Sequence, residues 1–276
     1  MTETIVLPLA ELRDFDADRL IPDEHNRIDV VTDYFTMPLL VVPRTGADKL
    51  VVLNNWAVDQ DRAAGEPVFQ RSTWSDEIRH HQIYVYDPAT GGPEYLSLGW
   101  GQVSPEKWAA FYIGRVVRTL AVKLGVGDPR DRMYFGSSAG GFMALALLAD
   151  DEGARAVINN AQFDWTRWMA TGVNALRHAR FGGMLPADIR ARFPLTANVL
   201  NLLARRGRPL RIDYHVNVAS THDRKEDLPT FNAFLAQHPQ LCGDVKVHHY
   251  FDRSAGHNPL AKSDTLRLLD GAFDRQ

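Results

Sequence analysis

The segment at residues 136–140, Gly-Ser-Ser-Ala-Gly, is the feature that most constrains how this chain can fold. It follows a short apolar run at residues 132–135 and leads into an apolar, helix-like stretch at residues 142–148. A Gly-x-Ser-x-Gly turn between strand and helix raises the serine hydroxyl above the sheet, and its glycines let strand and helix pass closely. The glycine spacing selects Ser138 rather than Ser137. The pattern predicts a nucleophile elbow, with a purely structural glycine turn as the alternative.

Short β-branched or aromatic runs alternate with helical stretches, which predicts an α/β fold with a mostly parallel sheet and helices on both faces. Several later runs are almost continuously apolar, as strands covered on both faces are. The expected strands are residues 28–34, 38–42, 50–53, 82–86, 132–135, 156–159, 210–217 and 245–251. The expected helices are residues 105–124, 138–148, 229–237 and 260–273, the first with Ser104 as its N-cap and Pro105 at its first position.

Residues 163–208 interrupt this alternation between two expected strands. The segment holds several short helical pieces, a break at residues 181–183 and a basic stretch at residues 205–208. We predict a small helical cap over the sheet edge within a single domain that spans residues 1–276, with a longer ordinary connection as the alternative. A chain of 276 residues can bury a sizeable core.

Composition removes several function classes. Thirty-one basic and 34 acidic residues give a net charge of −3, so nucleic-acid binding is not expected. The chain has no apolar run near the roughly 20 residues that span a bilayer, and its start lacks a signal-peptide pattern. The single cysteine, Cys242, fits a reducing compartment, and we expect a cytoplasmic location. The adjacent His80 and His81 have no spaced carboxylate cluster and no phosphate-binding glycine motif occurs, so neither metal nor cofactor is expected.

A serine nucleophile needs a base, and His257 is the best placed of the ten histidines. It lies on a loop at residues 252–259 that follows the last expected strand, where it could reach a serine at the end of the sheet. His248 and His249 lie within that strand and are expected to be packed or paired. The sequence therefore predicts His257 as the general base.

A carboxylate is expected as the third partner, because it orients the imidazole and stabilises its charged form. Asp223 is the first candidate, since it lies in the loop that follows the strand at residues 210–217. Asp164 also follows a strand, and Asp227 lies in the same charged loop as Asp223. Both remain alternatives for the acid.

The order Ser138, Asp223, His257 on about eight strands resembles the α/β-hydrolase superfamily. The resemblance covers roughly residue 28 to the C-terminus. In that family the elbow follows the fifth strand, the acid usually the seventh and the histidine the eighth, and the expected strands match each position. The resemblance implies an α/β-hydrolase fold with a mostly parallel eight-stranded sheet and a serine catalytic triad.

An oxyanion site is expected beside the elbow. The Ala139 N–H belongs to the first turn of the predicted helix and is available there. The family's second donor follows its third strand, often in a glycine-containing sequence. Residues 54–57 read Asn-Asn-Trp-Ala and lack those glycines, so a backbone N–H of Trp56 or Asn55 would have to serve. A side-chain amide of Asn54 or Asn55 is a further candidate.

The resemblance implies acyl transfer through an acyl-serine intermediate. Asn55, Trp100 and Trp165 are the predicted substrate-binding residues, with core and cap packing as the alternative for the aromatic pair. The double-glycine elbow and the segments at residues 69–74 and 98–101 also resemble bacterial hydrolase-fold proteins of surface-glycan loci. That resemblance favours an ester on a carbohydrate.

The expected function is therefore a serine esterase that acts on a small-molecule or glycan ester. An acyltransferase with the same triad is the first alternative, because the same residues serve it when water is excluded. A non-catalytic binding protein of the same fold is the second. The sequence leaves the oligomeric state open, a homo-oligomer included.

Overall fold

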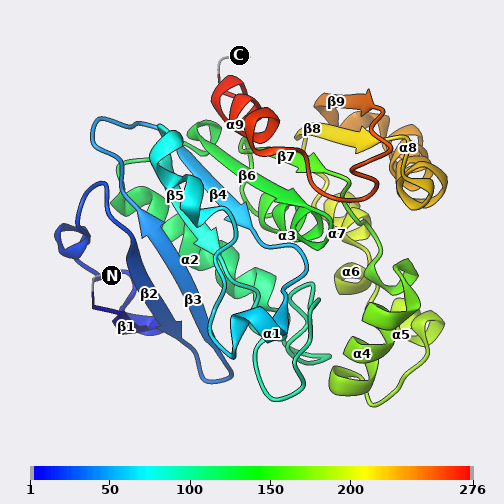
Figure 1. The fold of residues 1–276 in the computed structure, drawn as a ribbon, viewed down its shortest axis with the longest axis horizontal. Coiled ribbons are helices and arrows are strands. Elements are labelled where there is room, and N and C mark those ends of the chain that lie inside the picture. The colour runs from blue at the N-terminus through cyan, green and yellow to red at the C-terminus, as the bar shows by residue number, and fades with distance from the viewer. Residues whose placement is uncertain (1–2, 274–276) are drawn as a thin grey trace.

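A nine-stranded sheet forms the centre of the computed structural model, which describes residues 3–273 (Figure 1). The strands are β1 (Ile5–Pro8), β2 (Asn26–Val31), β3 (Thr36–Val42), β4 (Leu50–Asn54), β5 (His81–Val85), β6 (Arg132–Ser137), β7 (Arg155–Asn159), β8 (Leu210–Asn217) and β9 (Cys242–Tyr250). Their order in the sheet is β1-β2-β3-β5-β4-β6-β7-β8-β9. β3 is antiparallel to both of its neighbours, and the other neighbouring pairs are parallel.

The predicted mostly parallel sheet is confirmed, but the predicted number of strands was one too few. Strands β2 to β9 correspond to the eight predicted runs. The ninth strand, β1, pairs with β2 at the edge of the sheet and is only four residues long. Of its side chains only Leu7 is buried, so β1 lacks the continuous apolar run that marks the inner strands.

Helices cover both faces of the sheet, as predicted. The helices are α1 (Gln60–Ala63), α2 (Ala109–Lys123), α3 (Ala139–Leu148), α4 (Ala170–Arg180), α5 (Pro186–Arg192), α6 (Pro194–Ala197), α7 (Val199–Arg206), α8 (Leu228–Gln237) and α9 (Lys262–Gly271). On β4, Leu50 and Val52 join the apolar cluster of α2, α3, α7 and α8, whereas Val51 and Leu53 join the cluster of α9. Within residues 3–273, no helix combines the length and the apolar character that crossing a membrane requires.

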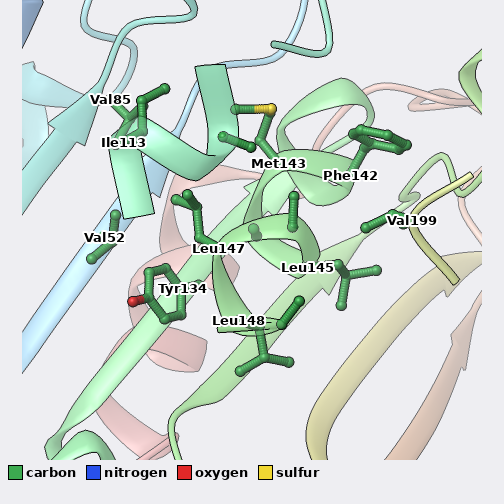
Figure 2. Packing of buried hydrophobic residues seen from close by; sticks show 14 of the residues in the cluster. Val52, Val85, Ile113, Tyr134, Phe142, Met143, Leu145, Leu147, Leu148 and Val199 are labelled. Atoms are coloured by element: carbon green, nitrogen blue, oxygen red, sulfur yellow. The ribbon is translucent and has the colours of Figure 1, made fainter. Parts of the chain in front are cut away.

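The helix α3 is buried on every side, and all ten of its residues are shielded from solvent. Figure 2 shows its side chains among Ile113 of α2, Tyr134 of β6 and Val199 of α7. A helix that is apolar all round belongs in the interior of a protein. The core therefore fixes the position of α3 and of the bend that precedes it.

The predicted start of α2 is wrong by four residues. The helix begins at Ala109 rather than Pro105, and Trp108 occupies its N-cap position. Ser104 caps a tight turn instead, where its Oγ accepts a backbone N–H at 3.1 Å, and Gln102 pairs with Trp108 as an isolated antiparallel bridge. Serine followed by proline favours turns as well as helix starts, which is why the pattern misplaced the boundary.

The segment at residues 163–208 contains four helices between β7 and β8. The last, α7, packs into the helical layer next to α3, where Val199 and Leu203 are buried. Figure 1 shows α4, α5 and α6 grouped beside the sheet, with α6 next to α7. The segment therefore has one helix in the layer over the sheet and three beside the sheet, whose buried residues Leu176, Ile189 and Ala197 also join the main core cluster.

Gly140 lets α3 approach the end of β4. A Cβ added at Gly140 would lie 2.7 Å from the backbone oxygens of Asn54 and Asn55, and backbone cannot yield as a flexible side chain can. We expect Gly140→Ala to lower the free energy of unfolding by about 1–3 kcal/mol in urea titrations. Gly127→Ala is the control, because nothing lies within 4 Å of its added Cβ. Equal stability of the two variants would contradict this close packing.

Candidate active site

Ser138 lies at the bend between β6 and α3, with φ +55° and ψ −124°. A residue other than glycine rarely occupies this part of backbone space, and strain of this kind is found at functional sites. A Cβ at Gly136 would collide with the backbone oxygen of Gly140, and a Cβ at Gly141 would lie 2.5 Å from the Cβ of Ala161. Strand, strained bend and helix thus follow the geometry that the sequence pattern predicts.

The structure brings Ser138, His257 and Asp223 together in one chain of hydrogen bonds. His257 Nε2 lies 2.9 Å from Ser138 Oγ, and His257 Nδ1 lies 2.8 Å and 3.0 Å from the two oxygens of Asp223. Asp223 is fully buried and begins a short π-helix, η7 (Asp223–Asp227). The histidine comes from the loop after β9, so three separate segments meet at the carboxyl ends of the parallel strands.

These contacts determine the roles of the two imidazole nitrogens. A carboxylate only accepts hydrogen bonds, so Nδ1 of His257 carries the proton that faces Asp223. In the neutral ring, Nε2 is then the acceptor, and the Ser138 hydroxyl donates to it. Chemically, this arrangement can remove the serine proton and hold the resulting imidazolium beside a buried carboxylate.

The two alternative acids contact residues other than His257. Asp164 accepts bonds from the N–H and Oγ1 of Thr166 at 3.0 Å and 2.6 Å, which caps the short helix η6 (Trp165–Arg167). Asp227 lies 3.4 Å from Nε2 of His222. Burial, followed by the nearby charge of Asp223, raises the pKa of Asp227 to about 8. Asp223 is therefore the carboxylate that faces His257, while Asp227 is protonated at neutral pH.

Two asparagines at the ends of β7 and β8 hold the loop of His257. Asn160 Nδ2 donates to the backbone oxygen of His257 at 3.2 Å. Asn217 Nδ2 donates to the backbone oxygens of Asp252 and Gly256 at 2.6 Å and 2.8 Å. The backbone N–H of Asn217 also donates to Asn160 Oδ1 at 2.8 Å. This asparagine clamp fixes the histidine relative to the sheet.

Gln162, just after β7, contacts the serine directly. Its Nε2 lies 2.8 Å from Ser138 Oγ, and its Oε1 accepts from Trp100 Nε1 at 2.6 Å. Trp100 stacks on Trp165 with ring centres 5.6 Å apart, and both indoles are fully buried. The structure thus places these two predicted substrate-binding residues behind the site, where they offer no ring face to solvent.

Asn160, Gln162 and Asn217 were not predicted as site residues from the sequence. The available signal was polar side chains directly after apolar strands, at the edge of a parallel sheet where sites form. Asparagine after a strand is also an ordinary turn former, so the sequence alone does not distinguish a turn from a site at Asn160 and Asn217.

The loop after β4, from which the second oxyanion donor is expected, is already engaged in other hydrogen bonds. The Ala139 N–H lies in the first turn of α3, whose N–H groups lack partners within the helix. The Trp56 N–H, however, donates to Gln70 Oε1 at 2.7 Å. The Asn55 side chain is also engaged, since Nδ2 donates to the oxygen of Val68 at 2.6 Å and Oδ1 accepts from the Gln70 N–H at 3.0 Å. The Trp56 N–H and the Asn55 side chain thus already bond to Val68 and Gln70.

The side chain of Arg71 packs against the Trp56 ring of this loop. Its guanidinium carbon lies 4.1 Å from the ring centre of Trp56 and 4.9 Å from that of Phe135, and Nη2 donates to Ser137 Oγ at 3.1 Å. Burial lowers the pKa of Arg71 to about 9. Cation–π contacts with the aromatic rings stabilise such a buried guanidinium, and they tie the loop to the end of β6.

Trp168 lies beside the triad. The residue is half-buried, and its ring centre lies 4.4 Å from that of His257 and 4.6 Å from that of His222. It directly follows η6 in the segment at residues 163–208. That segment therefore contacts His257 through an aromatic side chain.

Solved structures share this architecture. The chain superposes on the capsule O-acetyltransferase of Neisseria meningitidis serogroup A with a TM-score of 0.63 at 13% identity, covering 90% of this chain and 94% of that one. For FphF, a fluorophosphonate-binding serine hydrolase of Staphylococcus aureus, the TM-score is 0.55 at 13% identity, with 92% and 99% covered. For MPT51 of Mycobacterium tuberculosis it is 0.53 at 17% identity, with 91% and 97% covered.

These likenesses concern the fold. The sequence matches no protein-family model and no curated protein. The identities to the solved structures are low, but the superpositions cover nearly the whole of both chains. The chain therefore has the α/β-hydrolase fold that its sequence predicts, and this fold resembles that of the capsule O-acetyltransferase.

The asparagine clamp can be tested at Asn217, which is fully buried. Asn217→Ala would remove the side-chain bonds to the backbone oxygens of Asp252 and Gly256, so we expect a loss of about 1–3 kcal/mol in the free energy of unfolding. A displaced His257 should also lower ester turnover by about 10- to 100-fold. Asn201→Ala is the control, because Asn201 is exposed and bonds only to a surface carbonyl. Wild-type stability and turnover in Asn217→Ala would contradict the clamp.

The raised pKa of Asp227 gives a pH-dependent prediction. Burial raises it from the ordinary 3.8 to about 8, so between these values the folded chain holds a proton that the unfolded chain has lost. The free energy of unfolding of the wild type therefore falls as the pH rises through this range. Asp227→Asn removes this titration. The unfolding temperature of the variant should therefore rise relative to that of the wild type by several degrees from pH 5 to pH 8, since 1 kcal/mol of stability corresponds to about 2–4 °C. A difference that does not change with pH would refute the assignment.

Proposed function

We propose that this protein is a serine esterase that cleaves a carboxylic ester through an acyl-enzyme. Ser138 is the nucleophile, His257 the general base and acid, and Asp223 the carboxylate that orients His257. The observation that carries the proposal is the unbroken chain of hydrogen bonds from buried Asp223 through His257 to Ser138 Oγ. No metal or cofactor is part of this proposal.

Acylation begins when His257 Nε2 takes the proton from Ser138. The electron pair of the broken O–H bond forms the bond from Oγ to the carbonyl carbon, and the carbonyl π pair moves onto its oxygen. The Ala139 N–H lies next to the elbow and can stabilise that oxyanion. When the intermediate collapses, the C–O bond to the alcohol breaks and His257 donates its proton to the departing oxygen.

Deacylation repeats these steps with a second hydroxyl compound. His257 takes a proton from water, whose oxygen attacks the acyl carbon, and Ser138 leaves with the electron pair of its bond and regains a proton. If a sugar hydroxyl replaces water, the product is a new ester rather than an acid. The choice between esterase and acyltransferase therefore depends on which acceptor reaches His257.

A carbohydrate ester is the substrate class that we favour. The resemblance in fold to a capsule O-acetyltransferase supports it. Trp168, half-buried next to His257, is an aromatic side chain suited to contact with a sugar face. We propose that residues 163–208 form a cap that, through Trp168, lies over the acceptor side of the site. The same likeness supports the acyltransferase alternative.

We also propose that the protein works in a reducing, cytoplasmic environment. Cys242 is exposed and its thiol is free. Proteins of oxidising compartments usually pair their cysteines in disulfides.

Covalent labelling tests the proposed nucleophile. Brief treatment of the wild type with a fluorophosphonate should give a single adduct that peptide mapping places on Ser138, and Ser138→Ala should give none. Asp223→Asn should slow labelling by about 10³- to 10⁴-fold, because the imidazole loses its correct tautomer, whereas Asp227→Asn should label like the wild type. A folded wild-type protein that stays unlabelled would favour the non-catalytic binding protein.

Product analysis separates the two catalytic alternatives. With an acetyl ester as donor, we expect acetate to exceed acetylated sugar when a monosaccharide acceptor is added at millimolar concentration. Acetylated sugar in excess over acetate would identify an acyltransferase instead. Ser138→Ala is the control for background hydrolysis in both assays.

A further inference from the structure

The side-chain amide of Gln162 is in contact with the reacting oxygen of the proposed site. Its Nε2 lies 2.8 Å from Ser138 Oγ, and His257 Nε2 lies 2.9 Å from the same atom. Gln162 is buried, and its backbone N–H donates to the backbone oxygen of Ser138 at 3.3 Å. Backbone and side chain of one residue are thus both bonded to the elbow.

The network determines which end of the amide faces the serine. The Trp100 indole nitrogen can only donate, so the atom of Gln162 at 2.6 Å from it is the carbonyl oxygen Oε1. The NH₂ end therefore faces Ser138 Oγ as a donor. Trp100 is itself held, because it stacks on Trp165 and its backbone oxygen accepts from Trp108 Nε1 at 2.8 Å.

The two nitrogens at Ser138 Oγ make complementary bonds. The hydroxyl donates its one proton to His257 Nε2, and a lone pair of Oγ accepts from the amide of Gln162. When His257 removes the proton, the amide bond to Oγ remains in place. Hydrogen bonds to a charged acceptor are about twice as strong as bonds between neutral groups, so this bond strengthens as charge develops on Oγ.

We propose that Gln162 is a catalytic residue that stabilises the negative charge developing on Ser138 Oγ. This inference rests on the proposed function. In acylation, the O–H bond breaks, the proton moves to His257 Nε2, and the electron pair left on Oγ forms the bond to the carbonyl carbon. In deacylation, the C–Oγ bond breaks and the pair returns to Oγ before the proton does. The Gln162 N–H faces Oγ at both stages.

Only the strengthening of the bond counts towards the rate, because the ground state already contains the weaker bond. We therefore expect a loss of about 10- to 100-fold in kcat when the donor is removed, which is less than the roughly 10²- to 10³-fold that one oxyanion-hole donor supplies. KM should change little, since the amide bonds to the enzyme's own serine rather than to a distant part of the substrate.

Three variants test the inference with a simple acetyl ester as substrate. Gln162→Met keeps the size of the side chain and removes the donor. Gln162→Glu keeps the shape but, once ionised, places negative charge beside Oγ. Gln102→Met is the control, because Gln102 is equally buried and bonds to the backbone oxygens of Trp100 and Thr196 without touching Ser138.

We expect kcat to fall about 10- to 100-fold in Gln162→Met by the same reasoning, at unchanged KM and by a factor that does not vary with pH. Gln162→Glu should lose more activity as the pH rises and the new carboxylate ionises. Gln102→Met should lower the unfolding midpoint at least as much as Gln162→Met while kcat stays within a few-fold of the wild type.

The proposal is overturned if Gln162→Met keeps kcat within about 3-fold of the wild type, or if its loss is matched by Gln102→Met, which would make the role structural. These outcomes differ from a failure of the proposed function, in which the wild type itself neither turns over the ester nor reacts with a fluorophosphonate. Trp100→Phe provides a second check, because it frees the amide to rotate and should reproduce part of the loss in kcat.

Discussion

The close approach of α3 to β4 and β6 is the constraint on which the rest of this structure depends. It requires glycine at Gly136 and Gly140, where a Cβ would meet backbone atoms. It also holds Ser138 in a strained conformation directly before the first turn of α3. Because α3 is buried on every side, the core keeps this strain in place, whereas a surface helix could shift to release it.

Around the elbow, the carboxyl ends of the strands form a buried polar network. Asn160 and Asn217 hold the loop of His257, and Gln162 holds the hydroxyl of Ser138. Buried polar groups must be hydrogen-bonded, and a network whose members are bonded is rigid. The bonds that stabilise this end of the sheet therefore also preorganise the reacting groups, so that little rearrangement is needed during reaction.

The loop after β4 shows where this chain departs from the superfamily it resembles. The loop lacks glycines, the Trp56 N–H is already bonded to Gln70, and Arg71 packs below the Trp56 ring. The first residue of α3, Ala139, follows Ser138 directly, and the amide of Gln162 donates to Ser138 Oγ. Trp168, from the segment that carries α4 to α6, packs its ring against His257.

The sequence by itself determined the strands β2 to β9, the elbow at Ser138 and the order of serine, acid and histidine, because each depends on a pattern within one continuous segment. It misplaced the start of α2 and missed β1, whose signals are short and shared with turns and loops. Only the tertiary structure decided that Asp223 rather than Asp227 faces His257, and that Gln162 reaches Ser138. A hydrogen bond depends on atoms about 3 Å apart, and the chain brings those atoms together from segments that no local pattern connects.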